Sequence, residues 1–267
     1  MEALKDKWSL GEPTLGLWAA SGSALATEVL ARAGLDYVCV DNQHGINDYS
    51  TTVSHLQAID AGGCAPMVRV PWTEPGIIGK MLDAGAEGLI VPMVNSVAEA
   101  EAAVRACRYA PLGARSFGPV RAAERRPDYF AVANDLVTCI PMIETVQAVD
   151  ALDDILGVSG VDAIYVGPAD LAVSLGLSPS SADAEPAFRE ALAAIVAACR
   201  RNGVVAGIHA TTAITEQRLE MGFQLVTVSS DTVAMRSGLA DAIAVAGRVA
   251  APNADGDPTE STADSVY

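Results

Sequence analysis

Four segments of the chain share one pattern of apolar and polar positions. In each, a glycine is followed by a short spacer and then by a run of mainly apolar residues, as in AGLDYVCVD and SGVDAIYVG. The glycines are Gly34, Gly85, Gly160 and Gly222, and seven positions after them stand Asp41, Pro92, Gly167 and Ser229. A glycine that ends a helix in the left-handed conformation and leads into a buried strand accounts for this pattern. A weaker copy begins at Gly62.

Helical patterns lie between these strands. Residues rich in Ala, Leu and Glu predict helices at 23–33, 48–61, 75–84, 96–107, 146–157, 186–202, 211–221 and 232–249. Further strands are predicted at 15–20, 65–70, 137–143 and 204–209. Strands that are apolar almost throughout and alternate with helices are typical of a parallel sheet. Eight such units in a chain of 267 residues favour the α/β class and a single (β/α)8 TIM barrel. A doubly wound sheet is the alternative, but the residues at 21–23 make a poor phosphate loop.

Charge and composition exclude several classes of partner. The formal net charge is -16, and such a field repels phosphate backbones and anionic lipid. We therefore expect neither nucleic acid nor a membrane as a partner. We assign residues 1–250 to the barrel. Residues 251–267, rich in Pro, Ser, Thr and Asp and without a basic residue, are predicted to be a disordered acidic tail.

The cysteines and the first residues indicate a compartment. Five cysteines without a CxxC pair are typical of reduced thiols inside the cell. The first residues lack the apolar segment of a signal peptide, and no apolar run is long enough to span a bilayer. A cytoplasmic protein is expected.

The residues that follow the predicted strands carry the candidate chemistry, because active sites of such barrels lie at the C-terminal ends of the strands. Two acids, Glu144 and Asp170, close the fifth and sixth strands. Such a carboxylate pair suits a hard divalent ion, Mg²⁺ or Mn²⁺, with water or substrate oxygens completing its shell. The alternative for Asp170 is a helix N-cap, since it precedes LAVSL. The pair on adjacent strand ends favours the metal.

Two further strand ends carry a histidine and an arginine. His44 follows a strand, and its side chain suits general acid–base work. Arg69 ends an apolar strand, where a charge is costly unless it meets an anion such as an enolate or a carboxylate. A salt bridge from Arg69 to Asp41 or Glu144 is the alternative.

The remaining histidines and the lysines narrow the chemistry. His209 ends the seventh strand, where it either lines a pocket or is an incidental rim residue, and His55 is expected to be structural or exposed. The three lysines, Lys5, Lys7 and Lys80, do not end a strand. Schiff-base chemistry needs a lysine within reach of the site, so metal-assisted carbonyl chemistry is favoured.

Six motifs in this order resemble the class II pyruvate aldolases of the HpcH/HpaI aldolase family, which are related to the citrate lyase β and phosphoenolpyruvate/pyruvate barrels. The motifs are DNQHG at 41–45, VRVP at 68–71, LDAG at 82–85, VPMV at 91–94, IET at 143–145 and GPADL at 167–171. The resemblance covers about residues 10–248. It implies a barrel that uses a divalent ion, with Co²⁺ or Zn²⁺ as alternatives to Mg²⁺ or Mn²⁺, and no organic cofactor.

The resemblance also implies roles for single residues. Glu144 and Asp170 match the metal ligands, and Arg69 matches the arginine that stabilises the pyruvate enolate. The substrate carboxylate is held by the backbone of Gly167, Pro168 and Ala169.

The other implied roles concern the acid–base group and the pocket wall. His44 resembles the family's acid–base histidine, supported by a dyad with the acid that matches Asp83. Trp18 matches a pocket-wall aromatic residue. Arg115, in the loop at 111–118, is placed near a subunit interface and the aldehyde end of the site.

The activity implied is that of a lyase. It cleaves a 4-hydroxy-2-oxo acid reversibly into pyruvate, or a related 2-oxo acid, and an aldehyde, in aromatic or sugar-acid catabolism. An oxaloacetate decarboxylase and a CoA-thioester lyase are the alternatives within the superfamily, and a non-catalytic barrel that binds oxo acids is a third. The family further implies a homo-oligomer, a hexamer or trimer, whose last helix packs on a neighbour.

Overall fold

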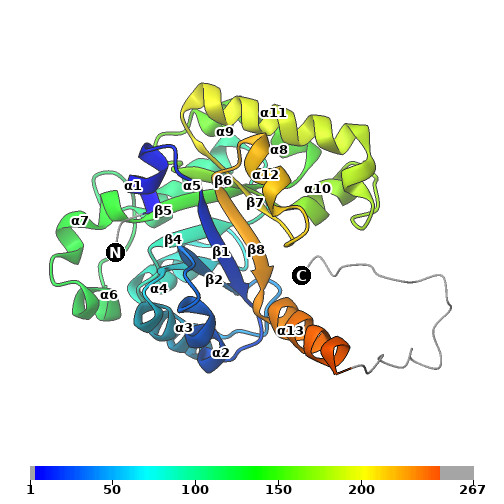
Figure 1. Ribbon diagram of the computed structural model, residues 1–267. Helices are drawn as coiled ribbons and strands as arrows, with labels where there is room; N and C mark the ends of the chain where they lie inside the picture. Colours follow the sequence, from blue (N-terminus) through cyan, green and yellow to red (C-terminus); the bar gives the residue numbers. More distant parts are fainter. Residues whose placement is uncertain (1–3, 247–267) are drawn as a thin grey trace.

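Eight parallel strands close into a barrel in the order in which they occur along the chain (Figure 1). They are β1 (Thr14–Ala19), β2 (Tyr37–Asp41), β3 (Ala65–Arg69), β4 (Gly88–Val91), β5 (Thr138–Ile143), β6 (Ala163–Val166), β7 (Val205–His209) and β8 (Leu225–Ser230). The computed structural model describes residues 4–246, so the predicted tail at 251–267 lies outside the described residues. The predicted α/β class and (β/α)8 TIM barrel are confirmed.

Helices connect the strands and surround them. They are α1 (Leu4–Ser9), α2 (Ala24–Ala31), α3 (Tyr49–Gly62), α4 (Pro75–Asp83), α5 (Val97–Cys107), α6 (Val120–Arg125), α7 (Tyr129–Leu136), α8 (Val146–Asp150), α9 (Leu152–Leu156), α10 (Pro168–Ser174), α11 (Pro186–Asn202), α12 (Thr215–Met221) and α13 (Asp231–Val245). The helix predicted at 146–157 is divided into α8 and α9, and the one predicted at 211–221 begins only at Thr215. Within residues 4–246, no helix combines the length and the apolar character needed to cross a membrane.

The four repeated glycines adopt the left-handed conformation that the sequence pattern predicts. Their φ angles are +91° at Gly34, +104° at Gly85, +98° at Gly160 and +104° at Gly222. The expectation for Gly62 is wrong by one residue. Gly62 is the last residue of α3, and the following glycine takes φ +87°.

The core has two layers, one between the strands and helices and one inside the barrel. The inner layer is built from large side chains, including Trp18, Tyr37, Met67, Tyr165 and Leu225. The ring of Tyr37 occupies the space beside Gly16, where an added Cβ would lie 2.3 Å from the ring. The inside of the barrel is therefore filled below its mouth, which leaves room for a ligand only at the end.

All five cysteines are buried and free, which agrees with the prediction of reduced thiols. They are Cys39, Cys64, Cys107, Cys139 and Cys199. Burial raises the pKa of the Cys199 thiol to about 12. A thiol that stays protonated is a poor nucleophile, so Cys199 acts as a small apolar side chain in the core.

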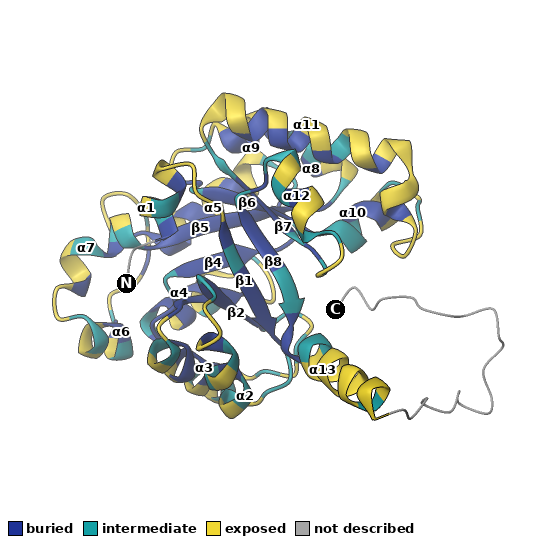
Figure 2. Cartoon of the chain, viewed as in Figure 1, coloured by how far each residue is buried: buried dark blue, intermediate teal, exposed yellow. Residues whose placement is uncertain are grey.

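The last helix, α13, extends away from the barrel and is exposed along almost its whole length (Figures 1 and 2). Asp231 is its only buried residue in the described range. The Asp231 carboxylate accepts hydrogen bonds from the backbone N–H groups of Ala20 and Ser21, so it joins the start of α13 to the loop after β1. Met235 and Leu239 are 50% and 63% exposed.

His55 lies in α3 and is fully buried against α2. Its Nδ1 is 2.7 Å from the hydroxyl of Thr27. Burial lowers the pKa of His55, and the charge of Asp231 opposes this effect without cancelling it. Of the two expectations for this histidine, the structural one is confirmed.

This burial predicts a pH dependence of stability. A histidine that is neutral when folded takes up a proton on unfolding at acid pH, so its contribution is present above about pH 6.5 and is lost below it. We expect the stability advantage of the wild type over His55→Gln, measured by urea denaturation, to shrink between pH 7.5 and pH 5. Parallel pH profiles of the two proteins would contradict this assignment.

Candidate active site

A pocket opens at the C-terminal ends of the strands. It is lined by Trp18, Arg69, Met142, Tyr165, Gly167, Pro168, Ala169, Asp170 and His209. Six of these residues belong to the predicted site, namely Trp18, Arg69, Gly167, Pro168, Ala169 and Asp170. The structure therefore brings together at one mouth residues that are distant in the sequence.

Arg69 and Asp41 form a buried ion pair at this mouth. They are register partners on β3 and β2, so their side chains leave neighbouring strands at the same level. The Arg69 Nε and Nη2 atoms donate to the two carboxylate oxygens of Asp41, each at 2.8 Å. Burial acts to raise the pKa of Asp41, but the hydrogen bonds and charge of Arg69 outweigh it and lower the pKa. The salt bridge left open by the sequence is thus present, and the partner is Asp41.

The Arg69 guanidinium also lies over the ring of Trp18, with its Cζ 4.2 Å from the ring centre. Trp18 in turn meets the His209 ring edge-on, at 5.1 Å between ring centres. A cation held against an aromatic face in a buried site is fixed in position. Asp41 and Trp18 therefore hold the cationic group of Arg69 at the pocket wall.

Asp41 also orders the loop that carries His44. Its Oδ1 accepts the backbone N–H groups of Gln43 at 3.0 Å and of His44 at 3.3 Å. The His44 side chain is exposed on this loop. One carboxylate thus links the position of Arg69 to the start of the loop at 42–45.

Glu144 follows β5 and is only 2% exposed. Its Oε1 accepts the backbone N–H of Met93 at 2.7 Å. Burial, together with the nearby charge of Asp170, raises the pKa of Glu144 to about 7. Met93 has φ +56°, a rare conformation for a residue with a side chain, so its backbone is strained where its N–H meets Glu144.

Asp170 is the third residue of α10 and is half-buried. Gly167 occupies the N-cap position, and Pro168 is the first helical residue. The alternative of Asp170 as an N-cap is therefore wrong, because the helix begins before it. A carboxylate in the first turn of a helix is stabilised by the helix dipole. Asp170 also lines the pocket, so its position in the helix is compatible with a role in the site.

The arrangement of Glu144 and Asp170 fits a divalent cation. Two carboxylates in a buried site repel each other unless a proton or a cation lies between them. A Cβ at Gly167 would lie 2.3 Å from Glu144 Oε2, so the glycine leaves the space that this carboxylate fills. In the range 4–246, no group of three or more His, Cys, Asp or Glu side chains could hold a metal ion. The protein would supply two ligands, and water or substrate oxygens would supply the others.

Asp83 contacts a residue other than the predicted one. It lies at the end of α4, and its Oδ1 accepts a hydrogen bond from Arg115 Nη2 at 2.7 Å. The Arg115 Nη1 donates to the Tyr129 hydroxyl at 2.9 Å. Burial raises the pKa of Asp83, and Arg115 opposes this. The dyad of Asp83 with His44 remains a prediction.

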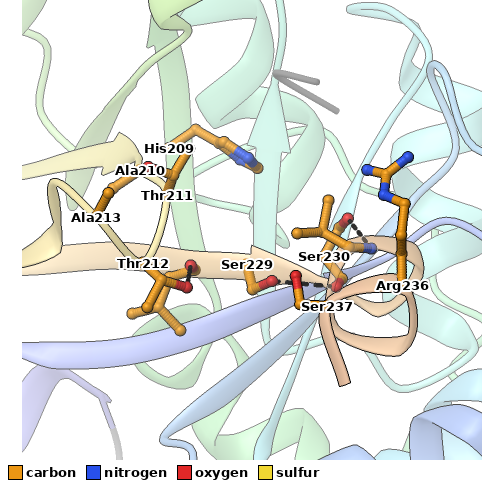
Figure 3. Close-up of a pocket in the computed structure, with 11 residues that line it drawn as sticks. His209, Ala210, Thr211, Thr212, Ala213, Ser229, Ser230, Arg236 and Ser237 are labelled. Carbon is orange, nitrogen blue, oxygen red and sulfur yellow. Dashed lines mark hydrogen bonds between the residues drawn. The ribbon is translucent and has the colours of Figure 1, made fainter. Parts of the chain in front are cut away.

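A second pocket of about 200 Å³ adjoins the first at the ends of β7 and β8 (Figure 3). It is lined by His209, Ala210, Thr211, Thr212, Ala213, Val228, Ser229, Ser230, Val233, Arg236 and Ser237. His209 lines both pockets, so it is a pocket residue and not an incidental one. The sequence predicts His209 at a strand end and places Ser229 seven residues after a repeated glycine, but nothing in it indicates that they share a cavity.

Comparisons with known proteins agree with this architecture. The family model HpcH/HpaI aldolase/citrate lyase matches residues 14–237. A 4-hydroxy-2-oxo-heptane-1,7-dioate aldolase from Salmonella paratyphi A is 37% identical over 248 residues, which are 91% of this chain and 93% of the relative. A family protein from Burkholderia cenocepacia J2315 is 37% identical with a TM-score of 0.85, covering 91% of this chain and 98% of that one. The citrate synthase SbnG is 28% identical with a TM-score of 0.81, covering 92% and 97%.

The family match spans the barrel and the candidate site, and the relative from Salmonella is an aldolase of nearly the same length. The resemblance of the six sequence motifs is thereby confirmed. The chain is an enzyme of the lyase class that belongs to the HpcH/HpaI aldolase/citrate lyase family.

Proposed function

We propose that the chain is a divalent-metal-dependent aldolase. It cleaves a 4-hydroxy-2-oxo acid reversibly into pyruvate, or a related 2-oxo acid, and an aldehyde. The observation that carries the proposal is the buried Glu144 carboxylate beside Asp170, at the same mouth as the Arg69 cation. This combination suits a cation and an anionic oxo acid together. The name of the Salmonella aldolase supports the same reaction type.

The chain offers binding groups for both the 2-oxo group and the carboxylate of the oxo acid. Mg²⁺ or Mn²⁺ held by Glu144 and Asp170 would polarise the 2-oxo group. Arg69, fixed by Asp41, would stabilise the negative charge that develops on the 2-oxo oxygen. The backbone of residues 167–169, which opens α10, would hold the carboxylate.

The bond changes in cleavage then follow. His44 would take the proton from the 4-hydroxyl group, and the C3–C4 bond would break as C4 becomes the aldehyde carbon. The electron pair of that bond would form the enolate of pyruvate, which takes up a proton at C3. Aldol synthesis would be the reverse sequence. Asp83 would orient His44 only if their dyad forms alongside the contact of Asp83 with Arg115.

The test is release of pyruvate from 4-hydroxy-2-oxo acids. With Mg²⁺ or Mn²⁺, a panel of such acids should yield pyruvate in an assay coupled to lactate dehydrogenase, and EDTA should remove the signal. Adding the metal back should restore it. No EDTA-sensitive pyruvate from any acid of the panel would refute the proposal.

The homo-oligomer implied by the family also remains a proposal. The exposed apolar side chains of Met235 and Leu239 on α13 support it, because a neighbouring copy could cover them. Small-molecule oxo acids and aldehydes are the other proposed partners.

A further inference from the structure

We propose that the pocket at the ends of β7 and β8 binds the aldehyde-derived half of the substrate, and that this half carries hydroxyl groups. The inference rests on the proposed function, since it takes the oxo acid to lie between Arg69 and Asp170. The proposed aldolase reaction does not determine which aldehyde is released, and the pocket indicates a hydroxylated one.

The position of His209 connects the two halves of the site. It lines the pocket that holds Arg69 and Asp170, and it also lines the neighbouring pocket of about 200 Å³. A substrate chain that continues beyond the carbon bonded to C3 must leave the first pocket, and His209 stands at one exit. Figure 3 shows the imidazole on one side of this pocket and Ser229, Ser230 and Arg236 on the other.

The lining of this pocket is rich in groups that hydrogen-bond to hydroxyls. Its hydroxyl side chains are Thr211, Thr212, Ser229, Ser230 and Ser237. A hydroxyl group both donates and accepts, so it can pair with a partner in either role. Thr212, Ser229 and Ser230 already form hydrogen bonds within the chain. A hydroxylated substrate chain can use the remaining lone pairs of these side chains and can pair with Thr211 and Ser237, whereas a purely apolar chain can do neither.

His209 has the protonation state that suits a hydroxyl group. Burial and the nearby charge of Arg69 lower its pKa to about 4, and the charge of Asp41 opposes them only in part. The imidazole is therefore neutral near pH 7, with one nitrogen as a donor and one as an acceptor. The edge contact with Trp18 orients the ring.

Another pocket beside His209 could also receive the aldehyde chain. A pocket of about 210 Å³ on the other side of the loop at 210–213 also meets Ala169 and His209. Its wall combines apolar side chains, Pro179, Ala182, Phe188 and Ile214, with the ion pair of Arg218 and Asp183. An alkyl chain would suit the apolar part of this wall, so the chemistry of the preferred aldehyde distinguishes the two exits.

The experiment compares two aldehydes of equal chain length in the synthesis direction. Wild-type enzyme with Mg²⁺ and pyruvate receives either glyceraldehyde or propanal, and kcat/KM is measured for each by product chromatography. We expect kcat/KM to be about tenfold or more higher for glyceraldehyde than for propanal, because only the hydroxylated aldehyde can form hydrogen bonds with the pocket. His209→Leu should reduce the preference about tenfold, and Ser229→Ala should reduce it by a smaller factor.

Ser180→Ala is the matched control, because it removes a hydroxyl from the competing pocket, and it should leave the preference unchanged. Exchange of the pyruvate methyl protons in D₂O, followed by NMR, reports enolate formation without any aldehyde. If the wild type shows no exchange with either metal, the proposed function fails and this inference fails with it. If exchange occurs, equal use of both aldehydes, or a preference that survives both His209→Leu and Ser229→Ala, overturns the inference alone. A fall in exchange that matches the fall in synthesis for both aldehydes would place His209 with the oxo acid and also overturn it.

Discussion

Glu144→Gln is expected to lower metal-dependent turnover by about a thousandfold while the barrel stays folded. The amide has the size of the carboxylate, and its carbonyl oxygen can still accept the backbone N–H of Met93. It lacks the negative charge that a divalent ion requires. Turnover is measured as pyruvate release at saturating Mg²⁺, and Mg²⁺ affinity by calorimetry.

Stability provides an internal check on this variant. Burial disfavours the charged form of Glu144, so the metal-free variant should be at least as stable as the metal-free wild type at pH 8. Glu190→Gln, which removes an exposed acid from α11, is the control and should retain both turnover and metal affinity. Retained metal binding in Glu144→Gln would show that the cation lies elsewhere.

Arg69→Met is expected to reduce the free energy of unfolding by about 3–5 kcal/mol, because it leaves the Asp41 carboxylate buried without its cation. The two side chains are only 2% and 3% exposed, so water cannot replace the lost partner. Urea denaturation at neutral pH measures the change. The same variant should lose turnover, because the cation at the pocket wall is gone.

A double replacement and a surface pair serve as controls. Asp41→Asn combined with Arg69→Met removes both charges, and the asparagine oxygen can still accept the N–H of Gln43, so much of the stability should return. Arg32→Met breaks an exposed pair with Glu28 and should cost less than about 1 kcal/mol. Similar losses for Arg32→Met and Arg69→Met would refute the assigned role of burial.

The barrel was predictable because its signal is local and repeated. Gly85 and Gly222 stand at the ends of α4 and α12 with positive φ angles, and a buried strand follows each within a few residues. The pair of Asp41 and Arg69 was partly predictable for a related reason. Residues that end neighbouring strands share a level of the barrel, which limits the possible partners to a few.

Features that depend on packing between distant elements could not be predicted in this way. The contact of Asp83 with Arg115 joins α4 to a loop with no periodic pattern, so no pattern in the sequence indicates it. The positive φ angle of Met93 has no signal in the residue type, and its N–H meets a carboxylate, Glu144, that is distant in the sequence. The alternative of Asp170 as an N-cap fails because Pro168 suits a first helical turn, which places Asp170 inside the helix.

The separation of the acidic pair from the hydroxyl-lined pocket bears on how such an enzyme diversifies. Glu144 and Asp170 stand after β5 and β6, whereas Ser229 and the residues beside it stand after β7 and β8. The loops that follow the strands of a barrel can vary separately, so substitutions at one pair of strand ends need not disturb the other. Under the proposed roles, substitutions at the ends of β7 and β8 would change the preferred aldehyde while the carboxylates after β5 and β6 keep the chemistry of the oxo acid unchanged.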